Sequence, residues 1–271
     1  MVHSSSNSNS VSSPVSSLHD WFHSPLGDYL LARERAWLDQ VVPDIFGFHA
    51  VQLGLPQFDL LRESRIAHRV TVNPDGNADA GVGVVAQWYE LPFDAQSVDL
   101  CVLPHVLEFT ENPHEVLREI DRVMRPEGRI LILGFNPWSL FGTRRLLSSK
   151  GFPWQGQFVS LVRMKDWLQL LGFEPSAGRL ACYIPPCESP VWQKRWRFME
   201  AAGDRWWGVG GGVYMLEAIK RVQGMRLIEP AWSDLKVKER KFAAVAKREG
   251  SSLADAMQPD PRSATHLHLV K

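Results

Sequence analysis

The sequence predicts an α/β fold in which a mostly parallel sheet carries helices on both faces. Two observations predict it. Short apolar runs that are typical of buried strands recur along the chain, and amphipathic helical patterns lie between them. Buried strands joined by crossover helices form a parallel sheet that is covered on both faces. A chain of 271 residues that is 45% hydrophobic can bury such a core.

The N-terminal part combines a polar segment with a helical pattern. Residues 1–17 are rich in serine and lack the basic start and apolar block of a secretory signal, so we expect a disordered tail. One domain is expected over residues 18–235. Helical periodicity runs over about 18–44, with Leu30 and Trp37 on the apolar face.

Five buried strands are expected next, each a short apolar run bounded by turn residues. In chain order their sequences are FHAVQL, which ends at Gly54, then HRVTVNP, VGVVAQ, SVDLCVLP and GRILILGF.

Two of the connections between these strands carry helix signals. Pro56 is expected to start a short helix after the first strand, because proline is tolerated in a first helical turn. Asn112 and Pro113 are expected to cap and start an amphipathic helix before the fifth strand, and Pro126 and Gly128 are expected to end it.

Beyond residue 136 the pattern is looser. The run MKDWLQLLGF predicts a helix that ends at Gly172, followed by a strand near 173–183, and GGVYMLEAIKR predicts a late strand. A tryptophan-rich insertion at about 185–208 lies between these strands. Residues 236–271 are polar, and we expect a C-terminal tail there.

Composition excludes several function classes. Thirty Lys and Arg residues balance thirty Asp and Glu residues, so net charge gives no signal for nucleic acid or an anionic membrane. No apolar run reaches transmembrane length. Cys101, Cys182 and Cys187 have neither the spacing of a zinc site nor that of a disulfide framework. We therefore expect a cytoplasmic protein without a metal site.

The run LPFDAQSVDLCVLPHVLEFTENPHEVLREIDRVMRPEGRILILGFNP, residues 91–137, resembles class I S-adenosylmethionine-dependent methyltransferases, specifically the methyltransferase type 11 group. The matching features are Leu-Pro-Phe at its start, Asp99 opening the fourth strand, the Asn-Pro helix, and the Gly-Arg that enters the fifth strand. A looser resemblance covers about residues 25–225. It implies a Rossmann-like, doubly wound sheet of seven strands in which strand seven is antiparallel.

The resemblance also implies S-adenosylmethionine as cofactor, although the glycine-rich loop is degenerate. The family places an acidic residue, one further residue and then Gly-x-Gly-x-Gly at the end of strand one. The matching positions here are Gln52, Gly54, Pro56 and Phe58. A residue without Cβ lets the backbone approach a ligand. Pro56 instead lacks an N–H group, and Phe58 adds bulk.

Two further acidic positions of the family are also amides here. The position that binds the ribose falls on Asn73, and the position that contacts the adenine amine falls on Gln87. An amide oxygen still accepts a hydrogen bond. It loses the charge-assisted bond, which is about twice as strong as a neutral one. Together with Gln52, three expected carboxylates are thus replaced by amides.

The remaining cofactor-binding residues implied by the resemblance are Trp88, which follows Gln87, and Pro104 and His105, which follow the fourth strand. His105 is also the candidate general base, since an imidazole titrates near working pH. The alternative is a structural histidine at a helix entry that contacts only backbone.

Two functions stay open. The first is a methyltransferase acting on an unidentified acceptor; its donor is already activated, so holding the nucleophile in line at about 3 Å is sufficient and no catalytic triad is needed. The second is a non-catalytic methyltransferase-fold protein, a pseudoenzyme that acts as a binding or regulatory module. A dinucleotide dehydrogenase would need Gly-x-Gly-x-x-Gly after the first strand, which is missing.

The helix expected over Trp192–Trp207 has two interpretations. Aromatic side chains interleaved with Lys194, Arg195 and Arg197 are typical of a surface that stacks on bases or lies on a membrane. More often, such a stripe packs onto its own domain and arginine stems cover it. As an insertion between strands six and seven, it could also cap a substrate entrance.

Overall fold

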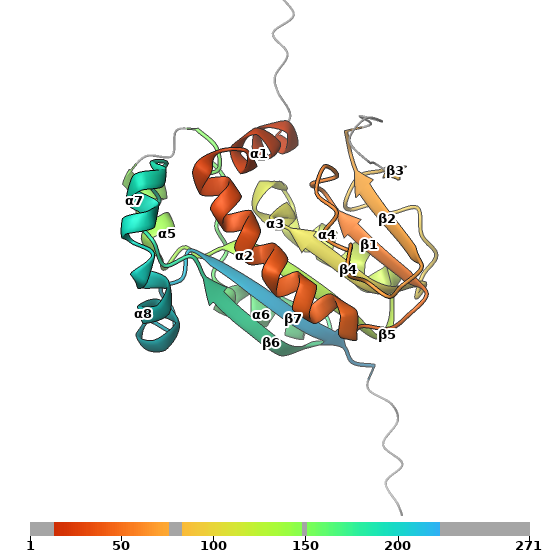
Figure 1. Ribbon diagram of the computed structural model, residues 1–271. Coiled ribbons are helices and arrows are strands. Elements are labelled where there is room, and N and C mark those ends of the chain that lie inside the picture. The colour runs from red at the N-terminus through yellow and green to blue at the C-terminus, as the bar shows by residue number, and fades with distance from the viewer. Residues whose placement is uncertain (1–13, 76–82, 148–150, 223–271) are drawn as a thin grey trace, which may run out of the picture. The chain divides into compact units, whose positions relative to one another are not determined.

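The computed structural model describes residues 14–75, 83–147 and 151–222 of the chain (Figure 1). They form a seven-stranded sheet in the order β3-β2-β1-β4-β5-β7-β6. All pairs are parallel except those of β7, which runs antiparallel to β5 and β6. This confirms the predicted fold. The strands are β1 (His49–Leu53), β2 (His68–Asn73), β3 (Val84–Val85), β4 (Val98–Pro104), β5 (Met124–Phe135), β6 (Phe173–Ala181) and β7 (Val213–Lys220).

Helices cover both faces of the sheet (Figure 1). Successive side chains of a strand point to opposite faces. Accordingly, Leu100 and Val102 of β4 join one core with the N-terminal helices, and Cys101 and Leu103 join a second core with the helices of the other face. The first set is α1 (Pro14–Phe22) and α2 (Pro25–Val41), and the second is α3 (Val106–Phe109), α4 (Pro113–Val123) and α6 (Leu161–Leu170).

The predicted N-terminal helix is divided into two helices. α1 begins at Pro14, inside the segment expected to be a tail, and α2 begins at Pro25. The Ser24 hydroxyl accepts a hydrogen bond from the N–H of Gly27 at 3.1 Å, and proline at the first helical position completes this start signal. A short 3-10 turn, η1 (Val42–Asp44), follows α2. The rest of the expected tails, residues 1–13 and 236–271, lies outside the described residues.

The connection from β1 to β2 differs from the prediction. Residues 54–67 form turns and no helix, so the helix expected at Pro56 is wrong. Gly54 and Leu55 have φ angles of 77° and 47°, which direct the chain into the left-handed region just before Pro56. The side chain of Gln52 also binds carbonyl groups of this loop that a helix would use.

Other elements refine the prediction. α4 begins at Pro113 as expected, but Asn112 makes no side-chain capping bond, and β5 starts at Met124 directly after the helix. α5 (Leu140–Leu147) was not predicted, and the tryptophan-rich segment forms two helices, α7 (Pro190–Arg195) and α8 (Phe198–Trp206). In the described part of the chain, no helix combines the length and apolar character needed to cross a membrane.

Candidate functional site

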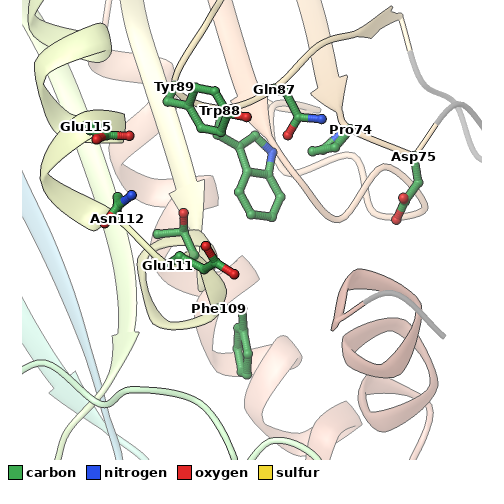
Figure 2. Close-up of a pocket in the computed structure, with 10 residues that line it drawn as sticks. Pro74, Asp75, Gln87, Trp88, Tyr89, Phe109, Glu111, Asn112 and Glu115 are labelled. Carbon is green, nitrogen blue, oxygen red and sulfur yellow. The ribbon is translucent and has the colours of Figure 1, made fainter. Parts of the chain in front are cut away.

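A cavity of about 540 Å³ lies beyond the carboxyl ends of β2 and β3, next to α3 and the start of α4 (Figure 2). Open α/β sheets bind ligands at this edge, near the point where the strand order reverses. In this sheet the reversal falls between β1 and β4. The residues that line the cavity are Pro74, Asp75, Gln87, Trp88, Tyr89, Phe109, Thr110, Glu111, Asn112 and Glu115.

A narrow cavity of about 10 Å³ adjoins the larger one, and Trp88 and Phe109 line both. A space of about 10–15 Å³ of this kind holds one water molecule, so the narrow cavity is about the size of a single water. Leu18 of α1 lines it and is itself only 5% exposed. The other lining residues are Gly54, Leu55, Pro104, His105 and Val106. The structure thus brings Gly54, Trp88, Pro104 and His105 together here, and places Gln87 in the larger cavity.

Asn73 ends β2 directly before Pro74 and Asp75, which line the larger cavity, but Asn73 itself lines neither cavity. Its Nδ2 donates to the carbonyl of Asp75 at 3.1 Å. Its Oδ1 is buried and has no hydrogen-bond partner within the described part of the chain. A buried acceptor without a partner costs about 1–3 kcal/mol. This oxygen can therefore take a hydrogen-bond donor from a water molecule or from a ligand.

Gln52 was expected to contact the cofactor directly. In the structure it lines neither cavity. Its side chain is buried, and Nε2 donates to the carbonyls of Gly54 at 3.0 Å, Leu55 at 3.0 Å and Phe58 at 2.9 Å. Its Oε1 accepts from the N–H of Leu60 at 3.0 Å. A carboxylate could not donate to these carbonyls. Gln52 is thus a positioning residue that holds the loop beneath the narrow cavity.

The other altered positions of this loop leave both cavities free. Phe58 packs against Phe22 of α1, with ring centroids 5.8 Å apart, and under the guanidinium of Arg35 at 5.0 Å. Gly54 is required by its backbone: its φ of 77° is left-handed, and a Cβ would lie 3.4 Å from Cγ2 of Val106. Of the three glycine positions of the family's loop, the one that lines the narrow cavity is thus still a glycine.

His105 is fully buried between two carboxylates. Its Nε2 lies 2.7 Å from Glu34 Oε1, and its Nδ1 lies 2.9 Å from Glu108 Oε2. Burial lowers the pKa of His105, but the charges of Glu34 and Glu108 and their hydrogen bonds outweigh it and raise the pKa to about 10. At neutral pH the ring is an imidazolium with both nitrogens donating, so it has no lone pair with which to act as the predicted general base. It also differs from a histidine that contacts only backbone.

The triad Glu34–His105–Glu108 connects four elements. Glu34 lies in α2, His105 follows β4, and Glu108 lies in α3 and accepts the N–H of Phe135 at the end of β5. Sequence reasoning missed both glutamates, because Glu34 stands between Arg33 and Arg35 on what reads as a solvated face. The spacing of three residues from His105 to Glu108 was the available signal.

Carboxylates surround the larger cavity from positions that the family pattern does not mark. Figure 2 shows Asp75 on one side of the cavity and Glu111 and Glu115 on the other, with the Trp88 ring between them. These three acids were not predicted as site residues. The cavity consequently has an acidic lining that favours ligands with hydrogen-bond donors or positive charge.

Residues 63–132 match a protein family described as Methyltransferase domain. Among curated proteins, the uncharacterized protein YafS of Escherichia coli (strain K12) is 37% identical over 158 residues, which cover 57% of this chain and 64% of YafS. The chain thus spans less than two thirds of the length of this relative.

Two solved structures share the fold. A SAM-dependent methyltransferase from Thermotoga maritima has a TM-score of 0.57 at 16% identity, and the match covers 76% of this chain and 96% of that one. Geranyl diphosphate C-methyltransferase from Streptomyces coelicolor A3(2), in complex with Mg²⁺, geranyl diphosphate and S-adenosyl-L-homocysteine, has a TM-score of 0.51 at 16% identity and matches over 72% and 78%. The sheet described above is the class I methyltransferase fold.

We expect Gln52→Glu to lower the free energy of unfolding by about 2–4 kcal/mol at neutral pH, because a carboxylate cannot donate to the three loop carbonyls. Burial beside carbonyl oxygens raises the pKa of the introduced carboxyl, so that this pKa is higher in the folded protein than in the unfolded chain. Stability is thus retained at low pH and lost as pH rises. Urea unfolding at pH 5 and pH 8 measures this. Gln169→Glu, at an exposed position of α6, is the control; equal stability of Gln52→Glu and wild type would contradict the role of Gln52.

The triad predicts a pH dependence of stability. The pKa of His105 is about 10 in the folded protein against an ordinary value of 6.5, so its stabilising contribution is complete below pH 6.5 and is lost as pH rises toward 10. We expect the free energy of unfolding to fall between pH 7 and pH 9, by at most about 1.4 kcal/mol per pH unit from this group. His105→Gln should be less stable at pH 7 and show a flatter profile in urea titrations. An unchanged slope would exclude a buried imidazolium.

Proposed function

We propose that this chain, a class I methyltransferase, binds S-adenosylmethionine and transfers its methyl group to an acceptor. One observation carries the proposal. Three separate segments of the sequence, at Gly54, Gln87-Trp88 and Pro104-His105, line two adjoining cavities at the ligand-binding edge of the sheet, and Asn73 directly precedes the lining residue Pro74. The related fold of the Streptomyces coelicolor enzyme, which holds S-adenosyl-L-homocysteine, supports the same ligand class.

The adenosyl part fits the larger cavity. The side-chain oxygen of Gln87 can accept from the adenine amine, and the unpartnered Oδ1 of Asn73 can accept from a ribose hydroxyl. The resemblance implies carboxylates at positions where this chain has amides. The acidic side chains near the ligand are instead those of Asp75, Glu111 and Glu115. Ionised acceptors form stronger bonds to hydroxyl and amine donors than neutral ones do.

The methionine part is assigned to the narrow cavity, next to Gly54 and Pro104. Methyl transfer from a sulfonium requires alignment of donor and nucleophile more than proton transfer. His105, held by two carboxylates, therefore contributes a fixed floor to this cavity and not a base. The acceptor would enter from the same edge of the sheet.

The non-catalytic alternative has one observation in its favour, namely the small volume of the narrow cavity, about 10 Å³. Leu18 of α1 lies in its wall, so binding of a methionyl group requires this side chain to move. Ligand binding therefore separates the two functions.

Isothermal titration with S-adenosylmethionine and S-adenosylhomocysteine tests the proposal. We expect a dissociation constant below about 100 µM. Asn73→Ala and Gln87→Ala should each weaken binding about 5- to 10-fold, which corresponds to the loss of about one hydrogen bond. Gln169→Ala, at an exposed glutamine of α6, is the matched control and should bind like wild type. Absence of heat at millimolar ligand would favour the non-catalytic module.

We further expect Leu18→Ala to tighten binding of S-adenosylhomocysteine several-fold, because less side chain has to be displaced from the narrow cavity. The same change should lower stability by about 2–3 kcal/mol through lost packing. Leu26→Ala in α2, which is buried outside both cavities, is the control: it should lower stability to a similar degree without tightening binding. Unchanged or weaker binding by Leu18→Ala would show that Leu18 does not restrict the cavity.

A further inference from the structure

A second surface of the molecule combines exposed apolar and basic side chains. We call it the Trp-basic surface and define it as residues 138–147, which include α5, and residues 190–209, which include α7 and α8. It carries ten large apolar side chains that are at least 42% exposed, among them Trp138 at 78% and Trp206 at 76%. Exposed apolar patches of this kind mark sites of interaction with proteins, membranes or ligands.

The two segments of the Trp-basic surface are adjacent in space. Figure 1 shows α5, α7 and α8 grouped together. A cavity of about 550 Å³ lies between them, and its wall combines Trp138 and Leu146 from the first segment with Met199 and Trp207 from the second. Exposed side chains of residues 138–147 and of the α8 part of the second segment thus border one hollow, and α7 lies beside it.

Charge distinguishes this surface from the rest of the protein. Its two segments contain six basic residues, including Lys194, Arg197 and Arg205, and two acidic residues, a surplus of four positive charges in a chain whose formal net charge is zero. Of the acids, Glu200 is directed inward and accepts the N–H of Tyr183 at 2.9 Å. The guanidinium of Arg195 lies 5.8 Å from the ring centroid of Trp192, whereas Arg144 and Arg145 pack over Trp154 and Phe158, which lie outside the surface.

We propose that the Trp-basic surface binds the surface of membranes that contain anionic phospholipids. Tryptophan favours the interface between water and acyl chains, and basic side chains attract anionic headgroups. Leu146, Leu147 and Val191, which are 83%, 84% and 75% exposed, are aliphatic. Such side chains fit an acyl layer and have no stacking partner on a nucleic acid, whose bases prefer aromatic platforms.

The position of the surface is consistent with this role. Trp138 follows the end of β5, and the segment with α7 and α8 joins the end of β6 to the start of β7, which pairs with the end of β5 through Phe135 and Val213. The surface therefore lies at the same edge of the sheet as the two cavities. This inference does not depend on the proposed methyl transfer.

Co-sedimentation of the full chain with vesicles tests the proposal. We expect binding to vesicles of equimolar phosphatidylcholine and phosphatidylglycerol, and much weaker binding to phosphatidylcholine alone. The double substitution Trp138→Ser and Trp206→Ser should weaken binding about ten-fold or more, because two interfacial side chains are lost. Lys194→Glu with Arg205→Glu should weaken binding to the anionic vesicles and make it less sensitive to salt.

The matched control is Val162→Ser with Leu170→Ser, which removes two side chains of α6 that are 71% and 84% exposed and lie outside the Trp-basic surface. These changes should leave vesicle binding unchanged, and thermal unfolding should show that all variants are folded. Three results would each overturn the proposal: no binding to anionic vesicles, equal loss of binding in the control, or a concentration-dependent dimer in light scattering that the Trp138 and Trp206 substitutions abolish.

Discussion

The site depends on how the chain turns after β1 without forming a helix. Backbone carbonyls in a buried turn need hydrogen-bond donors. In a helix, N–H groups four residues later would supply them. Here the amide of Gln52 donates to three of these carbonyls and accepts from a fourth residue. An amide at the position where the resemblance implies a carboxylate is therefore explained by the shape of this loop. It is not by itself a sign that a ligand has been lost.

The buried triad constrains the opposite side of the narrow cavity. An imidazolium between two carboxylates is costly to desolvate, and removal of one partner from a buried charge pair typically costs about 3–5 kcal/mol. Glu34, His105 and Glu108 belong to α2, the turn after β4, and α3. Leu18 of α1 packs in the same hydrophobic core as the apolar residues of α2, the helix that carries Glu34. The lining residue His105 is thus held in place by Glu34 and Glu108, which do not line the narrow cavity themselves.

Most of the strands and the parallel character of the sheet could be predicted from the sequence, because buried apolar runs alternate with helical patterns. The antiparallel strand seven was implied only by the resemblance, and the order of the strands was not predicted. The break between α1 and α2 was also readable in Ser24-Pro25, but the continuous apolar stripe concealed it. The site was less accessible. Spacing indicated that Asn73, Gln87 and His105 lie near the ends of strands, and they do. It did not indicate that the side chain of Gln52 would bind loop carbonyls or that Glu34 would be buried. Both depend on contacts between groups that only the folded chain brings together.

The larger cavity and the cavity of the Trp-basic surface differ in the chemistry of their walls. One lies beyond β2 and β3 and has carboxylates in its wall, whereas the other lies between α5 and α8, is lined mainly by apolar side chains and is part of the Trp-basic surface. An anionic bilayer would attract the basic surface and repel the acidic wall. With β1, β4 and β5 between them in the sheet, the two regions are kept apart. The same electrostatic difference that would orient the molecule on a membrane would therefore leave the acidic cavity facing water, where a polar nucleoside ligand can enter and leave.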